Sequence, residues 1–446
     1  MARMFGTDGV RGVANVELTC PLAFRLGQAA VRFQGPRILV GKDTRLSGDM
    51  LEAAVCAGIT SMGGTALLAG IIPTPAIALL VGQLECDGGI VISASHNPPE
   101  YNGIKLFDGQ GFKLPDAVED EIQEAIESGT LDAERPSGDA VGTIEDVPDA
   151  VDRYVRHAVD SVLMQDANLA GMKVALDCGH GASSTTSFQA LERLGADVRV
   201  MNDTFNGLDI NVQCGSTNLE PLKAYVAEVG ADVGIAHDGD ADRVMLVDSQ
   251  GNEIDGDMME AMLALDMKAR GCLPGDTAVS TVMCNLGFVN FLKDNGVAVV
   301  QTKVGDRYVL EEMRAKGYAI GGEQSGHLIM LDYNSTGDGL MTAVQFLAAV
   351  KRSGKSVDDA AHMYTKYPQE LINVRVSDKE AVFGNEAVQA AVKAAEAAMG
   401  STGRVLLRPS GTEPVIRVMV EAADDSDAKT HSRAIADVVI AELGIE

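Results

Sequence analysis

The chain has 446 residues, too many for one ordinary core, and 46% of them are apolar, so we expect a globular protein of two to four domains. Lysine and arginine number 36 against 64 aspartates and glutamates, which gives a formal net charge of −28. A surface this acidic repels nucleic acid and anionic lipid, so we expect neither partner. Whether the protein forms an oligomer stays open.

The cysteines and the apolar segments indicate the compartment. The seven cysteines are scattered without C-x-x-C spacing, which argues against a disulfide framework or a zinc site. The start, M-A-R-M-F-G-T-D-G, has no apolar run of the kind found in signal peptides. Residues 63–82 are the most apolar stretch, but two prolines there favour a buried strand and a short helix over a membrane span. We expect a cytoplasmic protein.

A short β-branched run, a glycine-rich loop and an amphipathic helix recur along most of the chain. Ser47 is predicted to cap a helix in which Leu51, Val55 and Ile59 recur at helical spacing. Strands are predicted at residues 37–41, 65–69, 89–93, 172–177, 197–201, 232–236, 243–247, 277–282, 297–303 and 318–321. Strands that alternate with helices imply βαβ units and mixed or parallel sheets.

The pattern changes near the end of the chain. From residue 370 we expect a strand, a long helix over 380–399, strands at 404–408 and 415–420, and a final helix over 427–443. Residues 128–149 mix Gly, Pro, Ser and acids, which is typical of a linker. We therefore predict three tandem α/β domains with mixed sheets, residues 1–150, 151–254 and 255–366, and a C-terminal α+β domain, residues 367–446.

A serine follows the strand at 89–93, in the run G-I-V-I-S-A-S-H-N-P-P-E-Y-N-G-I-K. Ser95 lies on a turn with two prolines, His96 is its neighbour, and Lys105 lies ten residues further on. A hydroxyl in this setting could accept and donate a phosphoryl group. An isolated Ser-His pair would more simply be a turn or a helix cap, but the surrounding special residues favour chemistry.

Three alternating carboxylates follow the strand at 232–236, in I-A-H-D-G-D-A-D-R. Asp238, Asp240 and Asp242 can converge on one hard cation, and without a cation they would repel one another. An EF-hand is excluded because Arg243 and Ser249 stand where that loop needs Gly and Glu. A solvated acidic turn is the alternative. With phosphate as a further ligand, Mg²⁺ fits better than Ca²⁺.

Two further loops offer polar groups to a sugar phosphate. The segment L-L-R-P-S-G-T-E-P-V-I-R could cradle phosphate, although a plain β-turn is the alternative. Its candidate ligands are Arg408, Ser410, Gly411, Thr412 and Arg417. The segment G-G-E-Q-S-G-H-L could bind sugar hydroxyls through Glu323, Ser325 and His327, or could be only a polar turn at a strand end.

Basic residues gather in other glycine-rich motifs and suggest a focused anion site in an otherwise acidic protein. The residues are Arg11, Lys42, Arg45 and, in V-G-D-R-Y-V, Arg307 beside Asp306. Cys178 and His180 could suggest a thiol nucleophile, but a turn after a strand explains them better. The sequence has neither a P-loop nor a dinucleotide-binding glycine motif.

Taken together, S-A-S-H-N-P, D-G-D-A-D-R, G-E-Q-S-G-H and R-P-S-G-T-E-P resemble the phosphoserine, metal, sugar and phosphate loops of the α-D-phosphohexomutase superfamily. The resemblance covers essentially the whole chain. F-G-T-D-G-V-R-G, V-G-D-R-Y-V and G-G-E-Q-S-G-H are most similar to its bacterial amino-sugar branch, which feeds UDP-N-acetylglucosamine and cell-wall synthesis. A departure is G-H-G-A at 179–182, where the family commonly has N-G-A; it touches no predicted catalytic group.

The resemblance implies four domains around a central cleft and a phosphoserine enzyme. Phospho-Ser95 would convert glucosamine 6-phosphate to a 1,6-bisphosphate and recover the phosphate from the 6-position. Mg²⁺ would be held by a phosphate oxygen on Ser95 and by Asp238, Asp240 and Asp242. Arg243, Arg11 and Lys105 would stabilise charge, with Lys105 a candidate proton shuttle and His96 beside the nucleophile.

Three rival interpretations remain at this stage. The chain could belong to the phosphomannomutase/phosphoglucomutase branch and prefer another hexose. An apolar strand that ends in D-x-D also begins haloacid-dehalogenase-type phosphatases, in which Asp238 would be the nucleophile and Ser95 incidental. A sensor that binds sugar phosphate would need the binding groups but no renewable phosphoserine.

Overall fold

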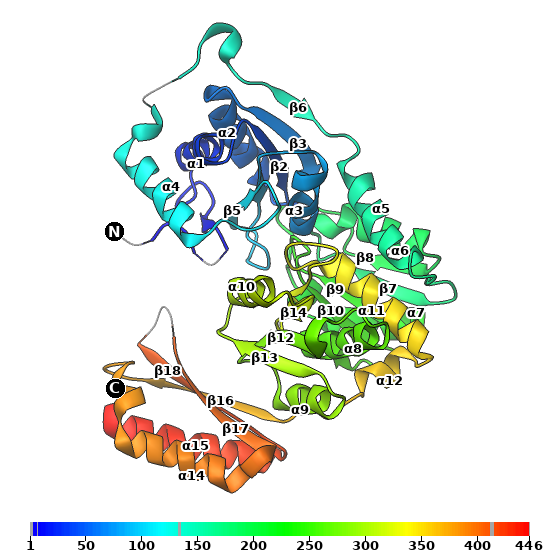
Figure 1. Ribbon diagram of the computed structural model, residues 1–446, viewed down its shortest axis with the longest axis vertical. Helices are drawn as coiled ribbons and strands as arrows, with labels where there is room; N and C mark the ends of the chain where they lie inside the picture. Colours follow the sequence, from blue (N-terminus) through cyan, green and yellow to red (C-terminus); the bar gives the residue numbers. More distant parts are fainter. Residues whose placement is uncertain (1–2, 7, 133–134, 411–413, 446) are drawn as a thin grey trace. The chain divides into compact units, whose positions relative to one another are not determined.

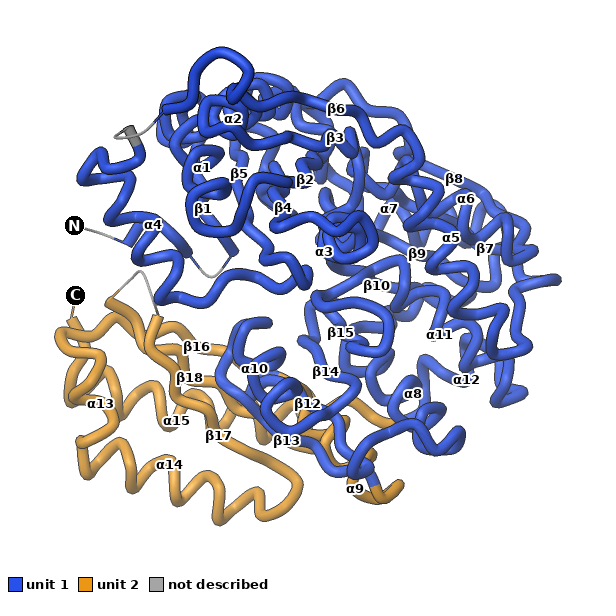
Figure 2. The backbone as a smooth tube through the Cα atoms, turned by 45° about the horizontal axis from the view of Figure 1, so that its top comes forward, with its two compact units in different colours: residues 1–283, 297–363 blue, residues 284–296, 364–446 orange. Residues whose placement is uncertain are grey.

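The computed structural model describes residues 3–6, 8–132, 135–410 and 414–445. The chain divides into two compact units (Figure 2), residues 1–283 with 297–363, and residues 284–296 with 364–446. Unit 1 holds three mixed sheets with helices and unit 2 a three-stranded sheet with helices (Figure 1), so the predicted fold class is confirmed. No helix in the described part of the chain is both long and apolar enough to cross a membrane.

The first sheet has six strands in the order β1-β5-β4-β2-β3-β6. Their bounds are Val10–Val13, Arg37–Lys42, Thr65–Ile71, Gly88–Ile92, Tyr101–Asp108 and Ile144–Asp146 for β1 to β6. Its helices are α1 (Cys20–Phe33), α2 (Gly48–Ser61), α3 (Thr74–Gln83) and α4 (Asp116–Ser128). The apolar faces of α1 and α2 pack on each other and, with Ile38, Val40 and Ile90 of the central strands, form the core that fixes the end of β4.

Three details of this domain differ from the prediction. β1 and β5 were not anticipated, and β5 pairs antiparallel with both β1 and β4, which places Lys105 opposite Val91. The hydroxyl of Ser47 makes no capping hydrogen bond; instead it accepts one from Nδ2 of Asn102 at 2.9 Å. The predicted linker includes β6, which adds to the sheet edge beside β3, so part of the segment belongs to the sheet.

The second sheet has the order β11-β10-β9-β7-β8. Its strands β7 to β11 are Lys173–Asp177, Asp197–Met201, Val233–His237, Val244–Asp248 and Glu253–Ile254. Its helices are α5 (Ala150–Leu163), α6 (Ser187–Arg193) and α7 (Glu220–Val229). β9 and β10 run antiparallel, and the tight loop between them carries the three alternating aspartates. The whole of β9 is buried, which brings that loop into the interior of unit 1.

The third sheet has the order β13-β12-β14-β15. Strands β12 to β15 are Thr277–Thr281, Ala298–Thr302, Ile320–Gly322 and Leu328–Met330. The helices of this part are α8 (Gly256–Ala269), α10 (Asp306–Lys316), α11 (Gly339–Ser353) and α12 (Val357–Ala361). The antiparallel pair β14 and β15 flanks the predicted sugar loop, and α11 is buried along nearly its whole length.

Unit 2 is built on an antiparallel sheet in the order β16-β18-β17, with α9, α14 and α15 among its helices. The strands β16 to β18 are Gln369–Arg375, Gly403–Pro409 and Val415–Ala422, and the helices α9 and α13 to α15 are Leu286–Asp294, Ala381–Gly384, Glu386–Met399 and Asp425–Leu443. The helix predicted over 380–399 is wrong in one respect, because it breaks at Asn385. Asn385 is extended, and its side chain caps α14 by accepting hydrogen bonds from the amides of Ala387 and Val388.

Candidate active site

Ser95 is held rigidly just beyond the end of β4. Its backbone has a left-handed φ of 52°, its side chain is 1% exposed, and its amide donates to Oγ of Ser93 at 2.9 Å. Its Oγ donates a 2.6 Å hydrogen bond to Oδ2 of Asp238 and lies 3.3 Å from Nδ1 of His96. The structure therefore brings the predicted nucleophile directly against the predicted metal loop.

Arg45 fixes the loop that carries Ser95. Its buried guanidinium donates to four backbone carbonyls, those of Ser95, Asn97, Pro98 and Tyr101, at 2.5–3.0 Å. Nε also donates to Oδ2 of Asp43 at 2.9 Å. All the N–H groups of the guanidinium are thus directed at acceptors of the protein. Arg45 therefore holds the loop in shape and does not serve the anion site that its glycine-rich motif suggested.

The three aspartates of the β9–β10 loop form a buried cluster. One carboxylate oxygen from each lies within 4.8 Å of the others, and this is the only group of three potential metal ligands found among the described residues. Oδ1 of Asp240 and Oδ1 of Asp242 are buried and accept no hydrogen bond from the described residues. Burial and the other two carboxylates raise the pKa of Asp238 well above its ordinary value. Orphaned, mutually repelling oxygens of this kind fit a hard divalent cation.

The metal loop lies so close to the serine loop that only glycine fits between them. A side chain at Gly239 would place its Cβ 2.6 Å from the carbonyl oxygen of Ser95. Behind it, the amide of Ala182 donates to the carbonyl of Gly239 at 2.9 Å. The G-H-G-A segment thus supports the metal loop through its backbone. Burial raises the pKa of the Cys178 thiol to about 12, which disfavours a thiolate there and agrees with the prediction that it is no nucleophile.

Lys105 joins the metal loop to the N-terminal segment. Its Nζ lies 2.8 Å from Oδ2 of Asp240, 2.9 Å from Oδ2 of Asp8 and 3.5 Å from Oδ2 of Asp242. Burial alone would lower the pKa of Lys105, but the charges of Asp240 and Asp8 outweigh it and raise the pKa. Lys105 is therefore a fixed cation in this state. Thr74 supplies another contact, because its hydroxyl donates to Oδ2 of Asp240 at 2.5 Å.

Arg11 and Arg243 provide guanidinium groups near the same cluster. Arg11 pairs with Asp8, and Nε of Arg243 lies 3.9 Å from Oδ1 of Asp242. The Nε atoms of both arginines are buried and find no hydrogen-bond partner among the described residues. Burial, together with the positive charges of Arg243 and Arg11, lowers the pKa of His96, so this histidine is neutral at neutral pH. These features suit a centre that receives a phosphoryl anion.

The predicted sugar loop connects β14 to β15 and packs against β10. The amide of Val244 donates to the carbonyl of Gly326 at 3.1 Å, and a Cβ at Gly326 would lie 2.0 Å from the carbonyl oxygen of Val244. Within the loop, Glu323 is half-buried and Ser325 is exposed. Oε1 of Glu323 accepts a 3.1 Å hydrogen bond from the amide of Gly305.

His327 is buried between two acidic groups. Its Nδ1 lies 3.7 Å from Oδ2 of Asp242, and its Nε2 lies 3.6 Å from Oδ2 of Asp306 and accepts a 3.2 Å hydrogen bond from the amide of Gly337. Burial would lower the pKa of His327, but Asp242 outweighs it and the net direction is upward. His327 thus links the sugar loop to the metal loop rather than standing free for a ligand.

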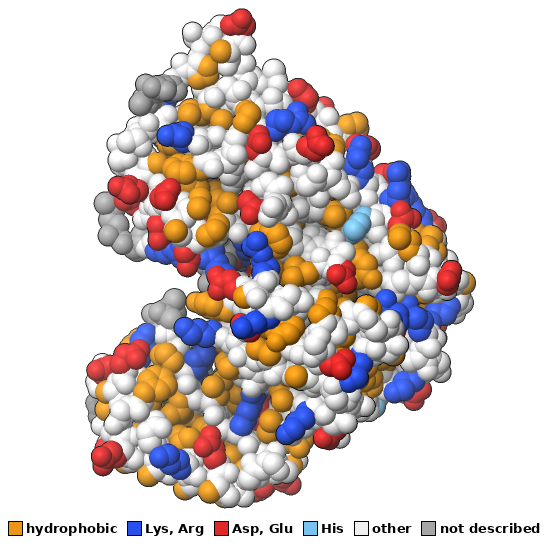
Figure 3. All heavy atoms as spheres, in the orientation of Figure 1, with side chains coloured by type: hydrophobic (Ala, Val, Ile, Leu, Met, Phe, Trp, Pro, Cys, Tyr) orange, Lys and Arg blue, Asp and Glu red, His pale blue; other side chains and the backbone are white. Residues whose placement is uncertain are grey.

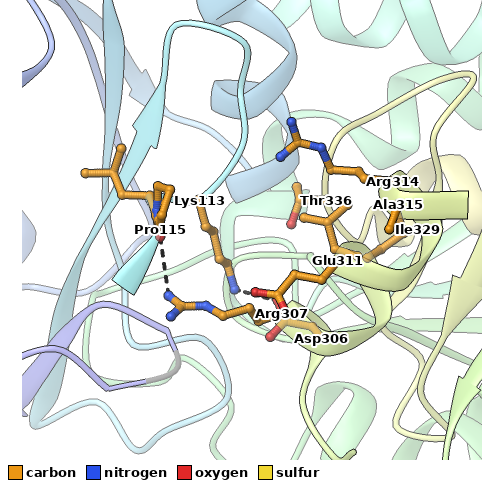
Figure 4. A pocket seen from close by; sticks show the side chains of 11 residues that line it. Lys113, Pro115, Asp306, Arg307, Glu311, Arg314, Ala315, Ile329 and Thr336 are labelled. Carbon is orange, nitrogen blue, oxygen red and sulfur yellow. Dashed lines mark hydrogen bonds and ion pairs between the residues drawn. The ribbon is translucent and has the colours of Figure 1, made fainter. Parts of the chain in front are cut away.

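Asp306 and Arg307 line a cavity of about 460 Å³ in unit 1, at the beginning of α10. Figure 4 shows Lys113 and Asp306 directed toward each other, with an Nζ–Oδ2 distance of 2.6 Å. The guanidinium of Arg307 is occupied by α4, where it pairs with Asp116 and lies 3.3 Å from Oε2 of Glu119. Both predicted residues therefore lie at a contact between the first and third domains.

The predicted phosphate cradle lies in unit 2. Arg408 of β17 and Arg417 of β18 are directly opposite in the antiparallel register, and Ser410 is buried at the end of β17. Burial and the charge of Arg417 lower the pKa of Arg408. Like charges that face each other across strands destabilise a sheet, so this pair suits a bound anion. Gly411 and Thr412 lie outside the described residues.

Sequence patterns missed three residues that shape the centre: Asp8, Thr74 and Lys113. They also assigned Arg45 to an anion site, whereas the structure shows it binding the backbone of the serine loop. Asp8 and Arg45 stand inside motifs that were recognised, whereas nothing in the sequence near Lys113 or Thr74 indicated their contacts. Lys42 does not serve the site either, since its Nζ pairs with Asp49 at 2.7 Å and Glu52 at 2.5 Å.

Comparison with known proteins identifies the family. Models of the phosphoglucomutase/phosphomannomutase family match residues 2–133 (α/β/α domain I), 152–251 (domain II), 255–367 (domain III) and 371–438 (C-terminal domain). The phosphoglucosamine mutase of Clostridium kluyveri is 49% identical, with 99% of this chain and 100% of that one covered. The phosphoglucosamine mutase of Mycobacterium sp. (strain KMS) is 50% identical over 98% and 99% of the two chains.

Solved structures share the fold at lower identity. A phosphoglucomutase/phosphomannomutase family protein from Burkholderia thailandensis superimposes with a TM-score of 0.83 at 23% identity, covering 99% of each chain. The N-acetylphosphoglucosamine mutase of Aspergillus fumigatus, solved with GlcNAc-6P and magnesium, gives a TM-score of 0.67 at 18% identity, covering 98% of this chain and 95% of that one.

Four matched domains and a serine set against a triad of aspartates define a hexose-phosphate mutase, and the chain belongs to the phosphoglucomutase/phosphomannomutase family. Within that family it groups with the phosphoglucosamine mutases, and its activity is that of an isomerase that transfers a phosphoryl group within a sugar phosphate. The phosphatase and sensor interpretations are not favoured by these relatives.

Proposed function

We propose that this chain interconverts glucosamine 6-phosphate and glucosamine 1-phosphate through a phosphoserine at Ser95 and a 1,6-bisphosphate intermediate. The observation that carries the proposal is the 2.6 Å contact between Oγ of Ser95 and Oδ2 of Asp238. It places the hydroxyl that would bear the phosphate at the edge of the only three-carboxylate cluster in the described part of the chain.

In the first half-reaction, the 1-hydroxyl of glucosamine 6-phosphate attacks phosphorus, the bond from phosphorus to Oγ of Ser95 breaks, and the hydroxyl proton ends on Ser95. The sugar then turns over. In the second half-reaction, Oγ of Ser95 attacks the phosphate at the 6-position, and the proton returns to the 6-hydroxyl of glucosamine 1-phosphate. Atoms and charge balance over the cycle, and the enzyme ends with its phosphoserine restored.

Asp238, Asp240 and Asp242, with a phosphate oxygen on Ser95, would hold the metal ion, and we propose Mg²⁺. When bound, the ion supplies positive charge to the moving phosphoryl group. The solved relative with magnesium supports this identity. Among the protein groups, Lys105, Arg11 and Arg243 neutralise the same charge, and the loop held by Arg45 fixes Ser95 for in-line transfer.

We assign the sugar and the second phosphate to the remaining predicted residues. We assign Glu323, Ser325 and His327 to the sugar, either by hydrogen bonds to its ring hydroxyls or by orienting the loop that makes those bonds. Asp306 and Arg307 would fix the beginning of α10 beside this loop. The phosphate that is not reacting is assigned to five residues of unit 2: Arg408, Ser410, Gly411, Thr412 and Arg417. Because the sugar turns over, this cradle has to accept either phosphate. Scattered cysteines and a sugar-phosphate substrate support a cytoplasmic location.

A substrate comparison tests the proposal. A hydroxyl in place of the ammonium at C2 should cost about 1–3 kcal/mol, or roughly 10- to 200-fold in kcat/KM. The measurement is kcat/KM for the 6-phosphates of glucosamine, glucose and mannose, each with its bisphosphate activator, and Ser95→Ala should lose activity on all of them. Equal or better turnover of mannose or glucose phosphate would assign the chain to the phosphomannomutase/phosphoglucomutase branch instead.

A further inference from the structure

A closed circuit of acidic and basic side chains starts and ends at the metal loop and passes through all three α/β domains. From Asp240 it runs to Lys105 at 2.8 Å, and from Lys105 to Asp8 at 2.9 Å. Lys113 then lies between Asp8 and Asp306, and His327 between Asp306 and Asp242. The metal loop and the sugar loop thus each contain a member of this circuit, and Lys105 ends the sequence run that carries Ser95.

Lys113 is the member that joins the first domain to the third. Its Nζ lies 2.7 Å from Oδ1 of Asp8 and 2.6 Å from Oδ2 of Asp306, and its side chain is only 11% exposed. Figure 4 shows this side chain reaching across to the first turn of α10. One largely buried cation therefore pairs with two carboxylates that lie far apart in the sequence, and each carboxylate makes a further contact in the site.

Asp8 and Asp306 each connect Lys113 to groups assigned to the reaction. Asp8 also contacts Lys105 and Arg11, the two cations of the first domain to which the proposed function assigns the charge of the phosphoryl group. Asp306 is the first residue of α10, and the amide of Gly305, immediately before it, donates to Oε1 of Glu323. A displacement of Asp306 would therefore move Gly305 and, through one hydrogen bond, the carboxylate assigned to the sugar.

We propose that Lys113 is a positioning residue that couples the sugar-binding segment of the third domain to the phosphoryl-transfer centre of the first. This inference rests on the proposed function, since it assumes that Glu323 binds the sugar. Without Lys113, Asp8 and Asp306 keep their negative charges and lose the cation between them. The carboxylates then separate, and the beginning of α10 shifts together with Glu323.

The test is steady-state kinetics on Lys113→Met and Lys113→Arg with glucosamine 6-phosphate and its bisphosphate activator. For Lys113→Met we expect KM to rise about tenfold or more while kcat changes less than about threefold. Asp8 keeps its contacts with Lys105 and Arg11, so the loss falls on the Asp306 side and on sugar binding. Lys113→Arg keeps the charge and should bring KM back to within about threefold of the wild type. Intact-mass analysis of each variant should show unchanged phosphate on Ser95.

Two further variants serve as a control and as a second test. Lys223 is a matched control, because its Nζ also bridges two carboxylates, those of Glu220 at 2.6 Å and Glu253 at 2.8 Å, away from the circuit. Lys223→Met should leave KM unchanged. The double variant K113M/D306N removes the unbalanced charge, so its melting temperature should recover toward the wild-type value while its KM stays high. This variant carries the test if Lys113→Met alone does not fold.

The outcomes separate the two proposals. A wild-type KM in phosphorylated, folded Lys113→Met or K113M/D306N enzyme would overturn the role of Lys113, and so would an equal rise in KM for Lys223→Met. An active wild-type enzyme that never carries a covalent phosphate would instead contradict the proposed function.

Discussion

Oγ of Ser95 and Oδ2 of Asp238 lie 2.6 Å apart although 143 residues separate them in the sequence. The serine belongs to the first domain and the aspartate to the second, so the contact exists only when the two domains are packed together. A phosphate on Ser95 would extend from this hydroxyl toward the carboxylate cluster. The charge of the cluster is therefore the first feature to test by mutation.

Asp240→Asn should weaken metal binding while the fold persists. Asp240 is fully buried. Its Oδ2 accepts a hydrogen bond from Thr74 and pairs with Lys105, which also contacts Asp8, whereas its Oδ1 finds no partner among the described residues and is the oxygen left for an ion. We expect the Mg²⁺ concentration for half-maximal activity to rise roughly 10- to 100-fold. Magnesium titrations of activity measure this, with the half-exposed Asp276→Asn as a control. Full activity of Asp240→Asn in the presence of a chelator would exclude a catalytic metal.

Arg45→Lys should slow catalysis by loosening the serine loop. A single ammonium cannot reach the four carbonyls that the guanidinium binds, although it can still neutralise Asp43. We expect a folded protein with kcat lower by a factor on the order of 10². Hydrogen exchange of the amides of His96, Asn97, Glu100 and Tyr101 should quicken. Arg199→Lys, on an exposed ion pair, is the control, and unchanged exchange in Arg45→Lys would contradict this role.

Arg417→Met should reduce the stabilisation of the protein by bound phosphate. Arg408 and Arg417 face each other across β17 and β18, so removing one should relieve about 0.2–1 kcal/mol of repulsion in the absence of phosphate. Inorganic phosphate should raise the melting temperature of the wild type more than that of Arg417→Met. Arg433→Met, which removes an exposed arginine of α15, serves as the control. An identical phosphate response in Arg417→Met and wild type would rule out this cradle.

Glu260→Gln should stabilise the protein increasingly as the pH rises. Glu260 is fully buried on α8, neither of its oxygens has a hydrogen-bond partner among the described residues, and burial with the nearby charge of Asp257 raises its pKa well above the ordinary value. The folded state therefore keeps a proton that the unfolded state loses above its own pKa.

The sign of this pH effect follows from that difference. As pH rises above the unfolded pKa, the wild type loses up to about 1.4 kcal/mol of stability per pH unit until the folded pKa is reached, whereas Glu260→Gln does not. The melting temperature of Glu260→Gln minus that of the wild type should be larger at pH 8 than at pH 5. A constant difference would show that Glu260 is ionised in the folded protein.

Local sequence patterns predicted a strand and the polar loop that follows it correctly where the two are adjacent in the chain. β4 followed by Ser95, and β9 followed by the three aspartates, were predicted because an apolar strand and its polar loop are adjacent in the chain. The register of β5 could not be read in the same way. No strand was predicted over Tyr101–Asp108, so Lys105 was found by motif rather than by its place opposite Val91.

Contacts between segments that lie far apart in the chain could not be predicted from the sequence. Lys113 meets Asp8 across 105 residues and Asp306 across 193, and no spacing rule relates them. Arg45 was assigned to an anion because the glycines around it are typical of anion loops, but burial turns its donors to backbone carbonyls. Basic and acidic side chains are interspersed on the surface in Figure 3, so composition alone could not distinguish structural cations from those of the site.

The most direct test of the account is whether the purified protein carries a covalent phosphate on Ser95. Intact mass before and after hydroxylamine, followed by peptide mapping, distinguishes a phosphoserine from an acyl phosphate on Asp238. We predict partial phosphorylation that maps to Ser95, survives hydroxylamine and is absent from Ser95→Ala. A hydroxylamine-labile phosphate on Asp238, or full mutase activity in Ser95→Ala, would contradict the phosphoserine mechanism.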